Sequence, residues 1–303
     1  MNYTVYKLDF HTGVHFGSGM LSGGDFVFCA DTLFSAIYLE ALKNGKSDLL
    51  YQEVQNGNLL LSDAFPYCEN RYYIPKPMLY VEPGNRGESS DKKKLKKLRY
   101  LPIDFLDDFL QGRLHADTCV MDEFGVAGSQ VMAAVRTESD TLPYVVGDYK
   151  FYENCGLYLI AGYQEKDQIE LLEELLENLS YTGIGGKRSC GKGKFDFKTT
   201  ARGTDCLLDR MDRKSDRYML LSTALPKEEE MKDSLEGASY LLQKRSGFVY
   251  SETFAEEQLR KRDMFTMQAG SCFRRTFRGD VYDVGEGGTH PVYRYAKAMF
   301  LGI

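Results

Sequence analysis

Hydrophobic and polar residues follow two different periods in the N-terminal part of the chain, and these periods predict its first elements. Residues 3–10 alternate with a period of two, which predicts a β-strand with one buried face. In residues 32–44 the apolar side chains recur every three or four positions, as in an amphipathic helix. Asp31 is the expected N-cap of this helix, and Gly45 is its expected C-terminal stop.

The same two periods return further along the chain and complete a repeated order of elements. The later segments are strand material at 59–65 and 72–80, a strand at 155–163, an acidic amphipathic helix at 168–179 and a strand at 194–198. Without the residues between about 84 and 150, the order is strand, helix, strand, repeated once. This order is the split βαβ, or ferredoxin-like, plan.

Residues from about 84 to 150 have weaker patterns and are interpreted as an insertion into the first domain. A small helix is predicted within residues 104–112. Residues 131–137 and 144–151 are rich in strand-forming side chains and are predicted to form the two arms of a hairpin.

After Thr200 the pattern changes to strand-like runs with one short helical segment at 226–237. The strand-like runs are residues 217–225, 238–251, 263–273, 280–284 and 291–300. The sequence therefore predicts an α+β chain with a first domain at 1–200 and a second, β-rich domain at 201–303.

Composition supports two domains and narrows the class of protein. A length of 303 residues exceeds one average domain, and a net charge of -6 argues against a uniformly basic surface. The seven cysteines include no C-x-x-C pair, so we expect them to be reduced. No apolar run approaches the length that spans a bilayer, so we expect no membrane contact and a cytoplasmic location.

The glycine-rich stretch 183–193 (GIGGKRSCGKG) contains the most distinctive chemistry of the sequence. Gly186, Gly191 and Lys192 fit the phosphate loop G-x-x-x-x-G-K-[ST] except at its last position, which is Gly193. The predicted order is also reversed, because a helix precedes the loop and a strand follows it. A mononucleotide site of the ATPase type is therefore disfavoured.

The same loop suits the backbone of a longer polyanion. Its glycines let backbone amides approach a phosphate, and its cations Lys187, Arg188, Lys192 and Lys194 neutralise charge, while Ser189 donates a hydrogen bond. The alternative is a solvated turn, although turns of this kind are usually shorter and less basic.

Two further groups of residues are candidates for contact with nucleic acid. His11 and His15 lack the additional ligands that zinc requires, but acid–base chemistry on RNA stays open for them, and Phe16 is placed to stack on an unpaired base. In the second domain, basic turns predict a second contact surface, although either turn could be plain surface; their residues are Lys244, Arg245, Arg274, Arg275 and Arg278.

Taken together, several segments resemble the RAMP superfamily of CRISPR proteins, and most closely the subunit of type III-A effector complexes that holds the 5′ handle of the guide RNA. The segments that show the resemblance are FGSG at 16–19, DTLFSAIYLEAL at 31–42, GIGGKRSCGKGKFDF at 183–197, LLQKRSGFVYS at 241–251, RDMFTMQAGSCF at 262–273 and HPVYRYAKAMF at 290–300. One departure is Ala296, where the family pattern suggests a glycine.

The resemblance implies two ferredoxin-like, RRM-related domains with a thumb hairpin inserted in the first, here within residues 118–149. It implies a non-catalytic subunit without a cofactor that binds crRNA, contacts a large palm-domain subunit and adjoins a backbone RAMP subunit. The family's RNA contacts carry over to His15, Phe16, Gly17 and Ser18 of the first loop and to Gly185, Gly186, Lys187, Arg188, Ser189, Gly191 and Lys192 of the glycine-rich stretch.

Two other functions stay open from the residues alone. The chain could be a metal-independent endonuclease that trims precursor guide RNA through His11 and His15, or a small-nucleotide enzyme that uses residues 186–193.

Overall fold

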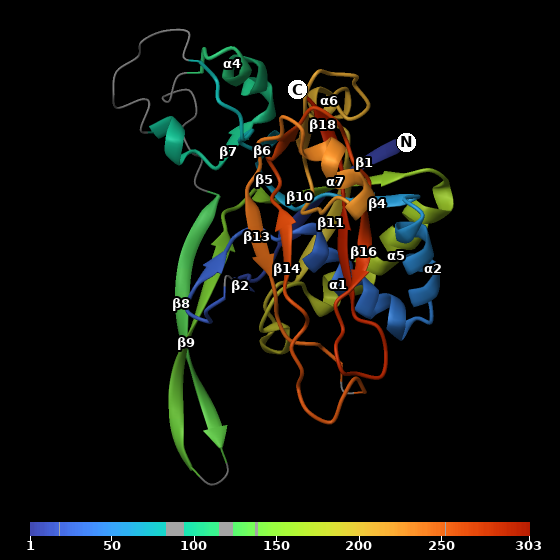
Figure 1. Ribbon diagram of the computed structural model, residues 1–303. Coiled ribbons are helices and arrows are strands. Elements are labelled where there is room, and N and C mark those ends of the chain that lie inside the picture. Colours follow the sequence, from blue (N-terminus) through green and yellow to red (C-terminus); the bar gives the residue numbers. More distant parts are fainter. Residues whose placement is uncertain (18, 83–93, 115–123, 137–138, 252) are drawn as a thin grey trace.

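The computed structural model describes residues 1–303 except 18, 83–93, 115–123, 137–138 and 252. Its main feature is an antiparallel seven-stranded sheet (Figure 1). The strand order is β11 (Phe195–Thr200), β1 (Asn2–Phe10), β10 (Cys155–Tyr163), β5 (Phe65–Cys68), β6 (Arg71–Pro75) and β7 (Tyr100–Pro102), and β4 (Leu59–Leu61) also pairs with β10. The α+β class predicted from the sequence is confirmed.

Three helices supply apolar side chains to a core on one face of this sheet: α1 (Ala30–Lys43), α2 (Ser47–Gln55) and α5 (Lys166–Thr182). The helix α5 follows β10 as predicted, and its apolar stripe is buried at Ile169, Leu172, Leu175, Leu176 and Leu179. The sequence did not indicate α2.

The prediction of one buried face for β1 is wrong, because both faces are covered. Tyr6 and Leu8 belong to the helical core, whereas Val5 belongs to a second core that includes Met219 and Leu301 from the C-terminal part of the chain. When both faces of a strand are covered, its polar side chains are buried as well. Lys7 is buried in this way, and its ammonium group donates a hydrogen bond to the Glu69 carbonyl at 2.6 Å.

Asp31 is not the N-cap of α1, and this prediction is also corrected. The helix begins at Ala30 after Cys29, and the Ala30 amide donates to the Asp63 carboxylate at 2.7 Å. Asp63 therefore satisfies an amide of the first turn from a distant part of the sequence. Gly45 has a φ of +67°, which fits its predicted place just after the helix end.

The insertion contains the predicted small helix and the predicted hairpin. The helical elements are η1 (Ile103–Phe105) and α4 (Leu106–Leu110). The strands β8 (Gly125–Arg136) and β9 (Ser139–Phe151) pair antiparallel and extend far from the body of the molecule (Figure 1). The two arms are longer than the sequence pattern indicated, since β8 begins six residues before Val131 (131 − 125).

The C-terminal part forms three small sheets. They are β15–β12–β18, β13–β14 and β16–β17, made from β12 (Tyr218–Leu220), β13 (Leu242–Arg245), β14 (Met264–Met267), β15 (Cys272–Phe273), β16 (Gly279–Asp283), β17 (Tyr293–Lys297) and β18 (Phe300–Gly302). Two short helices, α6 (Asp205–Leu208) and α7 (Glu228–Leu235), accompany them. The ferredoxin-like plan of both domains and their bounds at 1–200 and 201–303 stay predictions.

The expectation that every cysteine is reduced is contradicted for one pair. Cys68 on β5 and Cys155 on β10 lie directly opposite each other in the sheet and form a disulfide. Their separation of 87 residues hides this pairing in the sequence. Among the described residues, no helix has both the length and the apolar character needed to cross a bilayer.

Candidate nucleic-acid interface

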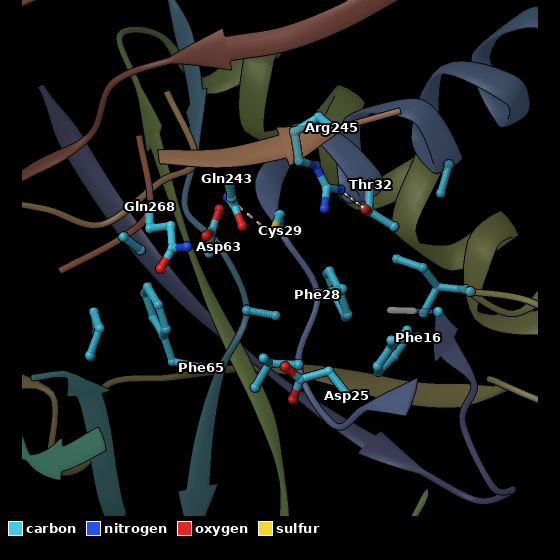
Figure 2. Close-up of a pocket in the computed structure, with 18 of the residues that line it drawn as sticks. Phe16, Asp25, Phe28, Cys29, Thr32, Asp63, Phe65, Gln243, Arg245 and Gln268 are labelled. Carbon is cyan, nitrogen blue, oxygen red and sulfur yellow. Dashed lines mark hydrogen bonds between the residues drawn. The ribbon is translucent and has the colours of Figure 1, made fainter. Parts of the chain in front are cut away.

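A cavity of about 770 Å³ lies where the loops of the first domain meet the second domain (Figure 2). One side is built from the first loop at Phe16 and from the start of α1 at Cys29 and Thr32, together with Ile184, Gly185, Gly186 and Arg188 of the glycine-rich stretch, between which Lys187 lies outside the lining. Gln243, Arg245 and Tyr250 line the cavity from the second domain. Segments far apart in the sequence therefore share one concave surface.

The glycine-rich stretch packs closely against the first loop, and its glycines make this approach possible. A Cβ on Gly185, whose φ is +96°, would lie 2.8 Å from the His15 carbonyl oxygen and 2.9 Å from Cδ1 of Phe16. The Gly186 amide donates to the same His15 carbonyl at 2.8 Å. Gly191 differs, since no atom lies within 4 Å of the place where its Cβ would be. Only part of the stretch is thus open to a ligand.

The cations of this stretch have different partners. Lys192 is buried and forms an ion pair with Asp148 of the hairpin at 2.8 Å. Its charge therefore holds the hairpin against the glycine-rich stretch instead of facing the polyanion that the sequence predicts for it. Lys187 donates to the Tyr144 hydroxyl at 3.2 Å and lies 4.7 Å from the centre of that ring. Arg188 lies 5.5 Å from the Tyr250 ring centre. Ser189, within η2 (Arg188–Cys190), is exposed.

Two of the four predicted contacts of the first loop, His15 and Phe16, are packed against protein rather than exposed. His15 is 5% exposed, and its Nδ1 lies 2.6 Å from the Gly147 carbonyl oxygen. Phe16 is 5% exposed and packs against Phe10 and Phe28, so the prediction of base stacking by Phe16 is wrong in this arrangement. The other two predicted contacts differ in status: Gly17, in the short pairing of β2 (Phe16–Gly17) with β3 (Gly24–Asp25), is exposed, and Ser18 lies outside the described residues.

The basic turns of the second domain separate into three cases. Arg245 lines the cavity and binds Asp31 through two hydrogen bonds of 2.8 and 2.6 Å. Lys244 points elsewhere, to Asp263 at 2.6 Å. Arg274 is exposed and does not line the cavity. The structure brings only Arg245 of these three residues to the cavity.

A buried charge network joins α1 to β13 and β17 beside the cavity. Asp31 accepts from Arg245 and, at 2.9 Å, from Arg294. Burial raises the pKa of the Asp31 carboxyl, but the two guanidinium groups outweigh burial, so its pKa lies below the ordinary value. The ionised Asp31 carboxylate thus connects α1 to the C-terminal strands through two ion pairs.

Asp63 is a second buried carboxylate in the same region, and no local pattern in the sequence indicated it. Burial raises its pKa to about 6, although hydrogen bonds from the Ala30 amide and from Thr223 oppose the rise. The nearby Cys29 thiol has a pKa raised to about 12, chiefly by burial, which makes it a poor nucleophile.

The two histidines that could act in cleavage are held by different groups. His11 is half-exposed and lies 2.8 Å from the Asp196 carboxylate, whereas His15 is held at Gly147. Within the part of the chain that the structure describes, no three His, Cys, Asp or Glu side chains gather in a way that could hold a metal ion. The arrangement favours binding an anionic strand at the cavity rim.

Comparison with known proteins covers the whole chain. The chain is 39% identical over 306 residues to the CRISPR system Cms protein Csm4 of Mycobacterium tuberculosis (strain CDC 1551 / Oshkosh), which covers 100% of this chain and 98% of the relative. It is 35% identical over 309 residues to the protein of the same name from Streptococcus thermophilus, with 99% and 98% covered. The profile of the CRISPR Csm4 C-terminal domain matches residues 213–303.

Solved structures share the fold at lower identity. A chain of the Csm3–Csm4 subcomplex of the type III-A CRISPR-Cas interference complex superposes with a TM-score of 0.68 at 19% identity, covering 100% of this chain and 99% of that one. A chain of the Csm1–Csm4 cassette in complex with cA4 gives a TM-score of 0.65 at 20% identity, with 100% and 98% covered.

Proposed function

The chain belongs to the Csm4 family, and from this premise we propose that it is the guide-RNA-binding subunit of a type III-A CRISPR effector complex. In this role it caps the 5′ handle of the crRNA and joins the large palm-domain subunit to the RAMP backbone. The relatives solved as a Csm3–Csm4 subcomplex and a Csm1–Csm4 cassette support the two protein contacts.

The uncompensated charge at the cavity rim carries the proposal for RNA binding. Among the residues that the structure describes, Lys187 and Arg188 face aromatic rings rather than carboxylates, so their positive charges are available to a phosphate backbone. Both residues belong to the glycine-rich stretch, whose Gly191 leaves the backbone open on one side. Backbone contacts of this kind position a strand without reading its sequence.

Replacing both rim cations tests this proposal directly. We expect Lys187→Ala with Arg188→Ala to weaken binding of single-stranded handle RNA about tenfold. The log–log salt slope should become shallower by about 1.4, since each lost phosphate contact on a single strand removes about 0.7. Fluorescence anisotropy at several salt concentrations measures both quantities.

A charge-matched control separates site binding from general attraction. Lys214 and Lys232 are exposed and lie outside the cavity lining, so Lys214→Ala with Lys232→Ala removes the same charge elsewhere. The control should keep the wild-type slope. Equal losses in the two double variants would contradict a site at the rim.

The subunit binds RNA without cleaving it in this proposal. The support is that His11 and His15 have separate partners, and that the Nδ1 of His15 is occupied by a backbone carbonyl. We expect labelled precursor RNA to stay intact with the purified chain in EDTA. A cut that disappears in His11→Ala would instead establish the endonuclease.

Co-expression with its neighbouring effector subunits tests the assembly. Native mass spectrometry should show this chain in one particle with crRNA, the large subunit and the backbone subunit. A particle that retains RNA and both protein partners after loss of this chain would contradict its capping and joining role.

A further inference from the structure

The rings around the cavity differ in their exposure. Phe16, Phe28 and Phe65 line the cavity but are each at most 5% exposed, so their faces are already covered by protein. Tyr250 lines the same cavity and is 73% exposed. The ring that Phe16 was expected to offer is therefore supplied by the second domain.

The backbone beside Tyr250 is anchored although the ring is free. Val249 is buried in a small core with Phe254, Val284 and Val292, and its amide donates to the Leu259 carbonyl at 2.9 Å. An isolated exposed aromatic residue is common at protein surfaces and needs no function. Tyr250 is distinguished by its place at the cavity and by the guanidinium group of Arg188 near its ring.

We propose that Tyr250 is the platform on which one base of the bound RNA stacks, with Arg188 on the rim holding the adjoining phosphate. Planar bases stack on aromatic side chains whatever their sequence, and an arginine adds attraction to the ring and to the phosphate. The proposal rests on the proposed function and adds to it a base contact that comes from the second domain. Strand binding then bridges Arg188 of the first domain and Tyr250 of the second.

The chain supplies a matched control for this residue. Phe248 is 50% exposed and also has an arginine near its ring, with Arg260 at 5.3 Å, but it does not line the cavity. Phe248→Ala therefore removes a similar ring and leaves the cavity intact. Tyr250→Phe keeps the ring and removes only the hydroxyl.

Binding of the full chain to a single-stranded RNA of about ten nucleotides tests the stack. We expect Tyr250→Ala to weaken binding about tenfold, in the range of one lost stacked base, and Tyr250→Phe and Phe248→Ala to bind as the wild type does. Equal effects of Tyr250→Ala and Phe248→Ala would overturn the proposal.

An abasic scan of the same RNA gives an independent readout. One abasic position should weaken binding to the wild type about tenfold and have no further effect on Tyr250→Ala, because the two changes remove the same contact. Additive losses at every position would overturn the stack.

The failure of this proposal is distinguishable from failure of the proposed function. If the wild type binds RNA through Lys187 and Arg188 but Tyr250→Ala binds equally well, only the stack is wrong. If Tyr250→Ala instead releases a protein subunit from the co-expressed complex while RNA affinity is unchanged, the ring is a protein contact and the stack is overturned. If the wild type binds no RNA, both proposals are overturned.

Discussion

The glycine-rich stretch and the junction beneath it contain similar cations in opposite environments. Lys187 and Arg188, beside and at the cavity rim, face aromatic rings, and no carboxylate of the described residues pairs with them. Arg245 lines the same cavity, but it shares the buried carboxylate of Asp31 with Arg294. A basic residue near a site is therefore available to RNA only when its partner leaves its charge uncompensated.

The largest expected effect comes from removing the carboxylate of the junction. Asp31→Ala leaves Arg245 and Arg294 without their anion, and breaking a buried ion pair in this way costs about 3–5 kcal/mol. Urea unfolding of the full chain measures the loss in the free energy of unfolding. Lys244→Ala, which breaks the exposed pair with Asp263, is the control and should change stability by less than about 1 kcal/mol. Similar losses for both variants would remove the distinction between junction and surface.

The pH dependence of stability extends the contrast between these carboxylates, because the pKa of Asp63, which lines the cavity, is raised whereas that of Asp31 is lowered. The folded pKa of Asp63 is about 6, above its ordinary 3.8, so its contribution is fully present below pH 3.8 and is lost as the pH rises through 6. The stability of the wild type relative to Asp63→Asn should therefore fall by about 3 kcal/mol between pH 3.8 and pH 7. Unfolding curves of both proteins across this range test the sign, and a pH-independent difference would contradict the shifted pKa.

A smaller effect distinguishes two glycines within the stretch itself. Gly185→Ala combines a φ of +96° with a close approach to the His15 carbonyl, so we expect a loss of about 2–3 kcal/mol. Gly191→Ala has a φ of +81° but open space around its Cβ, so we expect about 1 kcal/mol. Thermal unfolding ranks the two variants, and the reverse order would mean that Gly185 does not hold the two loops together.

Local patterns were enough to predict much of the first domain. The period of two in β1 and the stripe of α5 identified both elements, and turn chemistry located Gly45 after α1. The hairpin of the insertion was also predicted, although its arms proved longer. Each of these features is determined by residues that are close together in the sequence. Local sequence patterns are therefore enough to predict them.

The environment of the site residues could not be predicted in the same way. The burial of Phe16 depends on Phe10 and Phe28, and the pairing of Lys192 depends on Asp148 in the hairpin. Charge and residue type indicated the glycine-rich stretch as the candidate site, but the partners that decide whether a side chain is free come from distant segments. No local sequence pattern indicated that Tyr250 would be exposed at the cavity; the sequence showed only that it follows a basic turn.

The ion pairs of Asp31 also constrain the order in which the protein can be completed. The residue lies 214 positions before Arg245 and 263 positions before Arg294. During synthesis the start of α1 therefore leaves the ribosome long before either partner exists, and contacts of such separation form late. A nascent chain that stops before β13 has the first-domain loops but neither arginine partner of Asp31. The first domain thus reaches its final state only when the C-terminal strands have been made.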